Sequence, residues 1–175
     1  SRVDTEVDKR LDALAQAQPA NAARIAALKG KAAVANAKLA YALFAERFAS
    51  PRWKALEAKG GRLQRPLWAS TSTKNPAYRD VLYVEELIGP HTVNTMPPAT
   101  VEAFRDHGNV QRTVDARVDV ARQELAALEA LGISMDDVTA RLLAEGLASF
   151  EKSYDSLIAG LERKSAALGH QLAAR

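Results

Sequence analysis

Apolar residues recur at steps of three and four along residues 7–43. The repeat begins at Val7, is interrupted at Pro19 and resumes at Ile25. Such steps place apolar side chains on one face of a helix, and proline breaks a helix interior. The pattern therefore predicts helix in two or more pieces over residues 3–49.

Two short apolar segments depart from this helical pattern. Residues 63–69 lie between a glycine pair and a run of hydroxyl-bearing residues, and residues 92–96 are followed by two prolines. Bounded runs of this kind predict strands. Short helices are expected around them: one that starts at the Ser-Pro pair of residues 50–51, one over residues 81–88 and one over residues 100–104.

The rest of the chain has a helical pattern from Val114 onward. Ser134, with Asp137 three residues later, resembles a capping box and predicts the start of the last helix. The stripe on this helix lasts under about three heptads and includes Gly146 and Gly160, which favours packing on its own domain over a coiled coil. Its apolar residues follow in steps of four and three: Leu143, Leu147, Phe150, Tyr154, Leu157 and Leu161.

The order of elements is helix, strand, helix, strand, helix, with about thirty residues between the strands, and it favours parallel βα units. Parallel sheets normally have both faces covered by helices, and two strands alone do not make a stable one. The sequence therefore favours an α/β fold of which this chain holds a part. The alternative is a helical bundle in which both strand predictions are wrong.

Composition narrows the classes of function. The 175 residues fit one domain with a core, and much of the 47% hydrophobic content is alanine, which favours helix. The 24 basic and 21 acidic residues are spread along the chain, so a nucleic-acid partner has little support. The absence of cysteine excludes disulfides and thiolate metal sites. No apolar run approaches the roughly 20 residues of a membrane span, and we expect neither a signal peptide nor a membrane partner.

The segment RPLWASTSTKN, residues 65–75, has the most distinctive polar pattern. Its apolar run opens directly into hydroxyl-bearing residues and then Lys74. Ligands of parallel sheets bind beyond the carboxyl ends of the strands, and hydroxyls, backbone N–H groups and an ammonium suit a phosphate there. The same residue types dominate ordinary turns, so composition alone favours a solvated turn in which Lys74 is merely exposed.

Other polar residues form no catalytic pattern. The sequence has no catalytic triad, no phosphate-binding loop of the glycine–lysine type and no HExxH. Glu85 and Glu86 are adjacent on a helix, point in different directions and make a poor acid–base pair. Asn94 and Thr95 either face a site at the strand end or form hydrogen bonds with other polar groups at the strand ends. Three histidines lack partners at metal-ligand spacing and are expected to be structural: His91, His107 and His170.

Residues 64–108 closely resemble the transaldolase family in its bacterial form, through the run QRPLWASTSTKNPAYRDVLYVEELIGPHTVNTMPPATVEAFRDHG. Residues 1–12, SRVDTEVDKRLD, resemble the segment just after the sixth barrel strand of that family. The resemblance implies a (β/α)8 barrel, with residues 1–175 as the C-terminal part of a single barrel domain. This half holds strands seven and eight, their helices and a long C-terminal helix. The N-terminal half of the barrel is then absent from this chain.

The resemblance implies an enzyme that transfers a three-carbon dihydroxyacetone unit between sedoheptulose 7-phosphate and glyceraldehyde 3-phosphate. The family works through a lysine Schiff base, in the pentose phosphate pathway of the cytoplasm, with no metal and no organic cofactor. Fructose 6-phosphate and erythrose 4-phosphate are further implied partners. The family's Schiff-base lysine and acid–base carboxylates lie upstream of Ser1. No catalytic residue is therefore expected in this chain, and the fragment alone is expected to be inactive.

The family's phosphate-binding residues match three positions of this chain. Arg2 matches an arginine after strand six, and Ser70 and Lys74 match the serine and the basic residue after strand seven. The family often has arginine at the position of Lys74, and lysine keeps the charge but lacks the planar bidentate fork. The match favours the phosphate reading of residues 65–75. Lys74 is not expected to be the Schiff-base lysine, which must be desolvated.

A second reading comes from a different class of protein. The chain would be a helical interaction module that pairs with a partner through its last amphipathic helix. This reading predicts very little strand. Under the barrel reading, a half barrel exposes sheet edges and apolar surface, which favours association with the missing N-terminal half or with a second copy.

Overall fold

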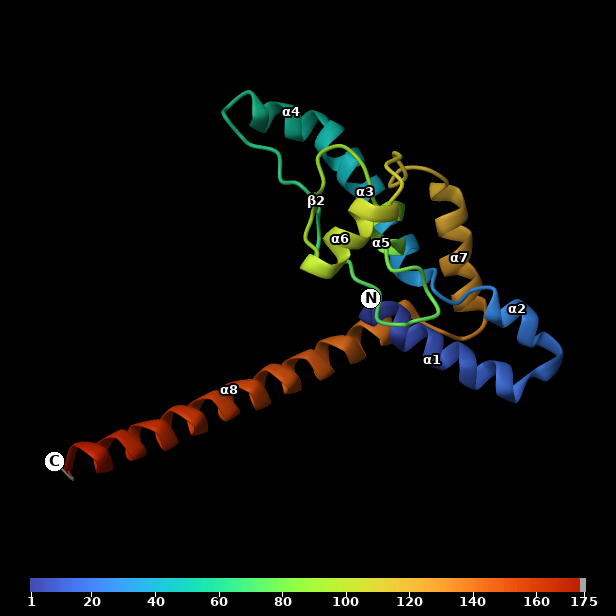
Figure 1. Cartoon of the computed structure of the whole chain (residues 1–175). Helices are drawn as coiled ribbons and strands as arrows, with labels where there is room; N and C mark the ends of the chain where they lie inside the picture. The colour runs from blue at the N-terminus through green and yellow to red at the C-terminus, as the bar shows by residue number, and fades with distance from the viewer. Residues whose placement is uncertain (174–175) are drawn as a thin grey trace. The chain divides into compact units, whose positions relative to one another are not determined.

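The computed structural model describes the backbone of residues 1–173 and the side chains of residues 1–168, so the side chain of His170 lies outside it. Two compact units make up the chain, Ser1–Met135 and Asp136–Arg175, and each is described by itself. Figure 1 shows the helices and strands of both. None of the helices in the described part is long and apolar enough to span a membrane.

The first unit begins with the helices that the apolar periodicity predicted. The first helix ends just before Pro19, since proline cannot continue a helix interior. The Ser50 hydroxyl accepts a hydrogen bond from the Trp53 N–H at 3.2 Å, and Pro51 is the first residue of its helix, as predicted. The elements are α1 (Arg2–Ala17), the 3-10 helix η1 (Pro19–Asn21), α2 (Ala22–Ala26), α3 (Ala32–Ala49) and α4 (Pro51–Glu57).

The sheet consists of β1 (Leu67–Trp68) and β2 (Val93–Asn94), which pair in parallel with Leu67 opposite Val93. Both predicted strands are confirmed, and both are shorter than predicted. Pro66 limits the pairing of β1, because it offers a carbonyl to the Val93 N–H at 2.9 Å but has no N–H of its own. The described residues thus form a helix-rich α/β chain with one small sheet.

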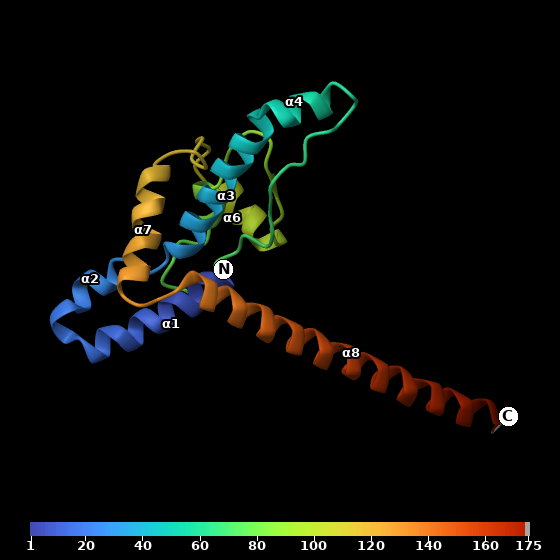
Figure 2. The ribbon, with the colours of Figure 1, turned by 180° about the vertical axis from the view of Figure 1, so that it is seen from behind.

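Three more helices complete the first unit. The helical segments predicted on either side of the second strand are confirmed, although their ends differ. α6 begins two residues earlier than predicted, because proline suits the first turn of a helix. α3 and α7 lie side by side, as Figures 1 and 2 both show. The three helices are α5 (Leu82–Glu86), α6 (Pro98–His107) and α7 (Val118–Ala130).

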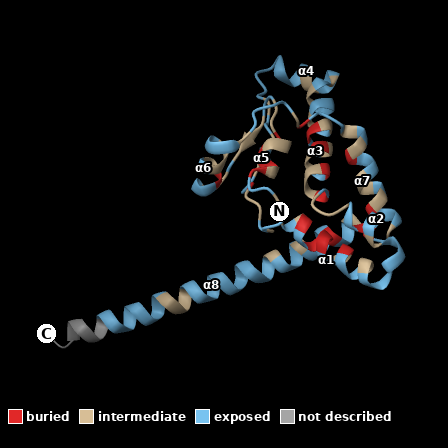
Figure 3. Cartoon of the chain, turned by 45° about the vertical axis from the view of Figure 1, so that its right-hand side comes forward, coloured by how far each residue is buried: buried red, intermediate tan, exposed pale blue. Residues whose placement is uncertain are grey.

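The core of the first unit lies among these helices, and Figure 3 shows buried residues along α1 and α3. Tyr41, Leu87 and Val114 form one buried cluster, and Trp68 of β1 packs against it. The Trp68 indole N–H also donates to the Leu87 carbonyl at 3.1 Å. Burial and this hydrogen bond therefore fix β1, and with it the polar segment that follows.

The second unit is formed by the long helix α8 (Met135–Ala173), which begins directly after Ser134, as the capping pattern predicted. Within this unit, no described residue outside the helix covers its apolar stripe. A seam of apolar residues specifies a face to be covered and not what covers it. The six side chains of the stripe are between 54% and 78% exposed: Leu143, Leu147, Phe150, Tyr154, Leu157 and Leu161.

Gly89 lies where the core leaves no room for a side chain. A Cβ at this position would lie 2.2 Å from Cγ1 of Val114, which is fully buried. We expect Gly89→Ala to lower the free energy of unfolding by about 1–3 kcal/mol, because a packed core accommodates an extra group only with strain.

Gly146 of α8 provides the matched control, since a Cβ there meets open space. Gly146→Ala should raise the stability of its helix by about 0.5–1 kcal/mol, because alanine loses less backbone entropy than glycine. Urea unfolding followed by circular dichroism measures both changes. Effects of the same sign would contradict the packing assigned to Gly89.

Candidate functional site

A cavity of about 490 Å³ lies beside β1. Leu67 and Trp68 of β1 form part of its wall, Arg2 enters from the first turn of α1, and Ser70 and Lys74 come from the loop after β1. The structure thus brings together all three residues that were predicted to bind phosphate, from segments far apart in the sequence. All three are exposed to solvent.

The polar groups after β1 divide into two sets. The Thr71 hydroxyl donates to Oδ1 of Asn94 at 2.7 Å, and the Ser70 N–H donates to the Thr95 hydroxyl at 3.2 Å. Asn94 and Thr95 therefore tie the two strand ends together, which favours their structural reading. The Ser70 hydroxyl and the Lys74 ammonium have no hydrogen-bond or ion-pair partner in the described part of the chain.

Ser70 itself has an uncommon backbone conformation. Its φ of 53° lies in the left-handed region, which residues other than glycine rarely adopt. Strained residues of this kind occur preferentially where a chain is held for binding or catalysis. The conformation of Ser70 is thus a second feature, besides the cavity, that points to the loop after β1.

Arg2 reaches the cavity from a helix end that a buried carboxylate anchors. Asp4 is 1% exposed, and its two oxygens accept hydrogen bonds from the Ala33 N–H at 2.8 Å and from the Tyr83 hydroxyl at 2.6 Å. These bonds join the first turn of α1 to the start of α3 and to α5. They fix the backbone of Arg2 relative to the other walls of the cavity.

A second carboxylate, one turn later on α1, repeats this arrangement. Asp8 accepts hydrogen bonds from the Gly30 N–H at 2.9 Å and from the Tyr78 hydroxyl at 2.5 Å. Gly30 has φ 71°, and a Cβ there would lie 2.8 Å from the Tyr78 ring, so only glycine fits. Because Tyr78 lies shortly after Lys74, this bond anchors the far end of the same loop.

Burial raises the pKa of the Asp4 carboxyl above its ordinary value, while the hydrogen bonds from Tyr83 and Ala33 oppose the rise. The pKa values of Tyr78 and Tyr83 are raised as well, first by burial and then by donation to a carboxylate. Both phenols therefore remain protonated donors at physiological pH. The two tyrosine–aspartate hydrogen bonds are consequently kept at physiological pH, and Tyr83 also lines the cavity beside β1.

These carboxylates were missed in the sequence, although a signal existed. Asp4 and Asp8 fall on the same helical face as Val7 and Leu11, at steps of three and four. An acidic residue on a buried face needs hydrogen-bond donors. Tyr83 lies 79 residues along the chain from Asp4, and Tyr78 lies 70 residues from Asp8. No local sequence pattern could therefore assign these donors.

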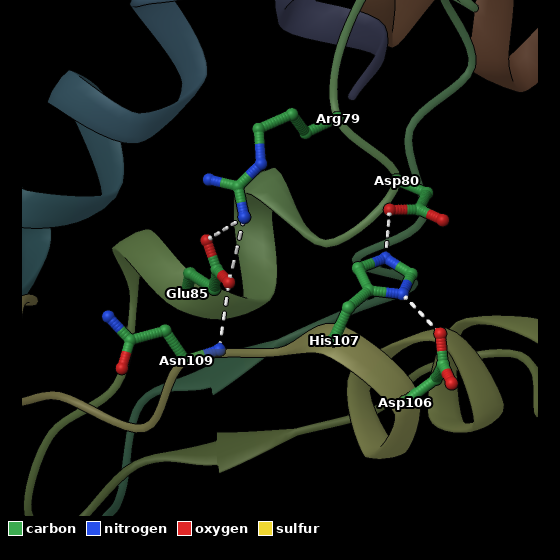
Figure 4. Close-up of polar contacts among 6 residues, drawn as sticks. All are labelled: Arg79, Asp80, Glu85, Asp106, His107 and Asn109. Atoms are coloured by element: carbon green, nitrogen blue, oxygen red, sulfur yellow. Dashed lines mark hydrogen bonds and ion pairs between the residues drawn. The ribbon is translucent and has the colours of Figure 1, made fainter.

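His107, at the end of α6, links that helix to Asp80, which follows the loop after β1 (Figure 4). Its Nε2 lies 2.9 Å from Oδ1 of Asp80, and its Nδ1 lies 3.0 Å from Oδ2 of Asp106. Hydrogen bonds from the ring to the two carboxylates raise the pKa of His107 above its ordinary value, and the pKa of Asp80 is lowered by the same contact. The structure gives this histidine a structural role, as expected.

The raised pKa of His107 makes this link dependent on pH. The ordinary pKa of histidine, which applies to the unfolded chain, is about 6.5. Below that pH the link contributes fully to stability, and its contribution is lost as the pH rises through the higher pKa of His107 in the folded state. We expect the ring protons of His107 to titrate above pH 6.5 in NMR spectra. Asp80→Asn should lower that pKa, and an unchanged pKa would contradict the contact.

Glu85 and Glu86 point in different directions, as predicted. Glu85 pairs with Arg79 at 2.8 Å and accepts the Asn109 N–H at 2.9 Å (Figure 4), whereas Glu86 pairs with Lys38 at 2.9 Å. Because each carboxylate has its own partners, the two do not form an acid–base pair with each other. Over the residues with described side chains, no three His, Cys, Asp or Glu residues are placed to hold a metal ion.

Comparison with known proteins assigns a family. The family model described as Transaldolase/Fructose-6-phosphate aldolase matches residues 1–161. The chain is 52% identical over 159 residues to the transaldolase of Frankia alni, which covers 90% of this chain and 41% of that protein. It is 50% identical over 163 residues to transaldolase 2 of Streptomyces avermitilis, an alignment that covers 93% of this chain and 42% of that protein. It is 54% identical over 159 residues to the transaldolase of Renibacterium salmoninarum, and this alignment covers 90% of this chain and 41% of that protein. The chain thus spans about two-fifths of the length of these curated relatives.

Proposed function

Because the chain belongs to the transaldolase/fructose-6-phosphate aldolase family, we propose that it forms the phosphate-binding side of a transaldolase. The complete enzyme would transfer a dihydroxyacetone unit from sedoheptulose 7-phosphate to glyceraldehyde 3-phosphate through a lysine Schiff base. β1 and β2 are assigned to strands seven and eight of the (β/α)8 barrel of the family. The observation that carries the proposal is the meeting of Arg2, Ser70 and Lys74 in one cavity beside β1.

The chemistry of this cavity suits a phosphate monoester. Two cationic side chains and a hydroxyl, none of which has a partner among the described residues, offer charge-assisted hydrogen bonds, which are stronger than neutral ones. A phosphate far from the reacting carbon supplies binding energy that holds the substrate carbonyl in position for the lysine. Arg2, Ser70 and Lys74 are therefore binding residues in this proposal and take no part in the covalent chemistry.

Lys74 does not have the surroundings of a Schiff-base lysine. Its side chain is exposed, whereas a nucleophilic lysine is held neutral by desolvation or by a neighbouring cation. The lysine buried in the first unit, Lys38, is held by Glu86 and lines a different cavity. The proposal consequently places the Schiff-base lysine outside this chain.

Borohydride trapping tests that placement. The protein is incubated with fructose 6-phosphate and sodium borohydride, and its intact mass is compared with 18.9 kDa. We expect no reduced three-carbon adduct on this chain, whereas the full-length Frankia alni relative, run in parallel, should carry one. An adduct on the 18.9 kDa species would contradict the proposed division of labour.

The exposed stripe of α8 favours a second candidate function, self-association through this helix. The steps of four and three suit the seam of a coiled coil. Residues 136–155 contain five acidic and two basic residues, and residues 156–175 contain three basic and one acidic residue. Antiparallel pairing with a second copy would therefore place each acidic half beside a basic half.

Sedimentation velocity tests the second candidate. We expect a dimer that Phe150→Glu dissociates, because Phe150 is 78% exposed in the middle of the stripe. Lys152→Gln, on the polar face of the same helix, should leave the dimer intact. A monomer at all concentrations, or a dimer that survives Phe150→Glu, would rule out this function for α8.

A further inference from the structure

A second cavity, of about 320 Å³, lies between α3 and α7 and shares no lining residue with the cavity beside β1. Its volume is that of about ten water molecules and falls at the lower end of the range for small-molecule sites. Figure 2 shows α3 and α7 side by side. The proposed function leaves this cavity without a role.

Part of the lining of this cavity between α3 and α7 is apolar. Val34 and Ala35 of α3 face Val120 and Ala121 of α7, and Leu82 of α5 belongs to the same lining. Ala35 and Ala121 are 1% and 3% exposed, so small side chains at these two positions leave the space that larger ones would fill. Such walls favour a compact apolar group, for example an aromatic ring or a branched alkyl chain.

The lining also carries an excess of positive charge. Lysines 29, 31 and 38 and Arg117 contribute four cations, against the carboxylates Glu86 and Glu124. Both carboxylates are already occupied, since Lys38 lies 2.9 Å from Glu86 and Lys31 lies 3.1 Å from Glu124. Lys29 pairs with Asp12 at 2.8 Å, outside the cavity.

Arg117 is the cation of this lining that has no partner among the described residues. It lies directly before the first residue of α7 and has φ 55°, a left-handed conformation that is uncommon for arginine. The positive end of the α7 dipole is beside it. A planar guanidinium in this position is suited to hold a carboxylate through two parallel hydrogen bonds.

We propose that the cavity between α3 and α7 binds a small organic monocarboxylate whose apolar body lies between the two helices and whose carboxylate pairs with Arg117. The buried Lys38 is held by Glu86 and by the Ala116 carbonyl at 3.4 Å, so this neutralised pair fixes the inner wall. The ligand is a monoanion, because the lining has a single cation, Arg117, that is unpaired among the described residues. The site does not depend on the proposed transaldolase role, since neither its residues nor its ligand are shared with it.

Benzoate is the probe, and its binding is followed in 1H–15N NMR spectra of the full chain. Excess inorganic phosphate is present throughout, so that the cavity beside β1 is filled and does not bind benzoate. We expect saturable shifts at the amides of Val34 and Val120. Benzamide, which has the same shape without the charge, should bind at least about tenfold more weakly. Arg117→Asn should also weaken benzoate binding at least about tenfold, because it removes the guanidinium while asparagine still tolerates the left-handed backbone.

Arg122→Gln is the matched control on α7, since Arg122 is exposed and does not line the cavity, and it should leave the affinity unchanged. Three results would overturn the proposal: no shift at the cavity, equal binding of benzoate and benzamide, or full affinity in Arg117→Asn. A benzoate affinity that falls as the phosphate concentration is raised further would also overturn it, because the site would then respond to charge alone.

Discussion

Asp4→Ala is expected to lower the free energy of unfolding by about 2–4 kcal/mol, because it leaves one buried and one partly buried hydrogen-bond donor without an acceptor. The donors are the Ala33 N–H and the Tyr83 hydroxyl, which lie 2.8 Å and 2.6 Å from the carboxylate. The same change frees the first turn of α1. We therefore expect weaker phosphate binding as well, although Asp4 does not touch the ligand in this account.

Asp12→Ala is the control for this prediction. Asp12 is on the same helix and pairs with Lys29, but its side chain is 57% exposed, so the change should cost less than about 1 kcal/mol. Chemical denaturation followed by tryptophan fluorescence measures both variants. If Asp4→Ala costs no more than Asp12→Ala, the buried carboxylate does not anchor α1.

Removing the two cations beside β1 should have the largest effect on binding. Arg2→Ala and Lys74→Ala are each expected to weaken fructose 6-phosphate binding by about ten- to one-hundredfold, since a charge-assisted hydrogen bond contributes about 1.5–3 kcal/mol. Both side chains are exposed, so the fold should be unaffected. Isothermal titration calorimetry gives the dissociation constants.

Arg62→Ala removes one positive charge at an exposed position outside the cavity and serves as the control. It should leave the dissociation constant within about twofold. If all three variants weaken binding equally, the protein attracts phosphate through its net charge and not through a site. In a complete transaldolase, Arg2→Ala and Lys74→Ala should impair substrate binding more than Schiff-base formation at saturating substrate.

Much of the local structure could be predicted because it depends on local rules. The Ser50–Pro51 helix start, the break at Pro19 and the start of α8 after Ser134 each follow from capping or from proline geometry. The two parallel strands could be located for a similar reason, since residues 67 and 93 stand in short apolar runs between turn residues. Their short length depends on Pro66, which has no N–H to extend the pairing of β1.

Contacts between distant segments could not be predicted in this way. The bonds of Asp4 and Asp8 to Tyr83 and Tyr78 join positions with no common pattern in the sequence. The left-handed conformation of Ser70 is likewise set by its surroundings. The family resemblance selected Arg2, Ser70 and Lys74, and the cavity that they share supports this choice without testing their role.

The most direct test of the central claim is a titration of the 15N-labelled protein with inorganic phosphate, followed at the amides of Ser70, Thr71 and Lys74. We predict saturable shifts at these positions, which the double variant Arg2→Ala/Lys74→Ala abolishes while the spectrum of the core is unchanged. Shifts that persist in the double variant, or that fall on exposed cations outside the cavity, would contradict the assignment of a phosphate site to these residues.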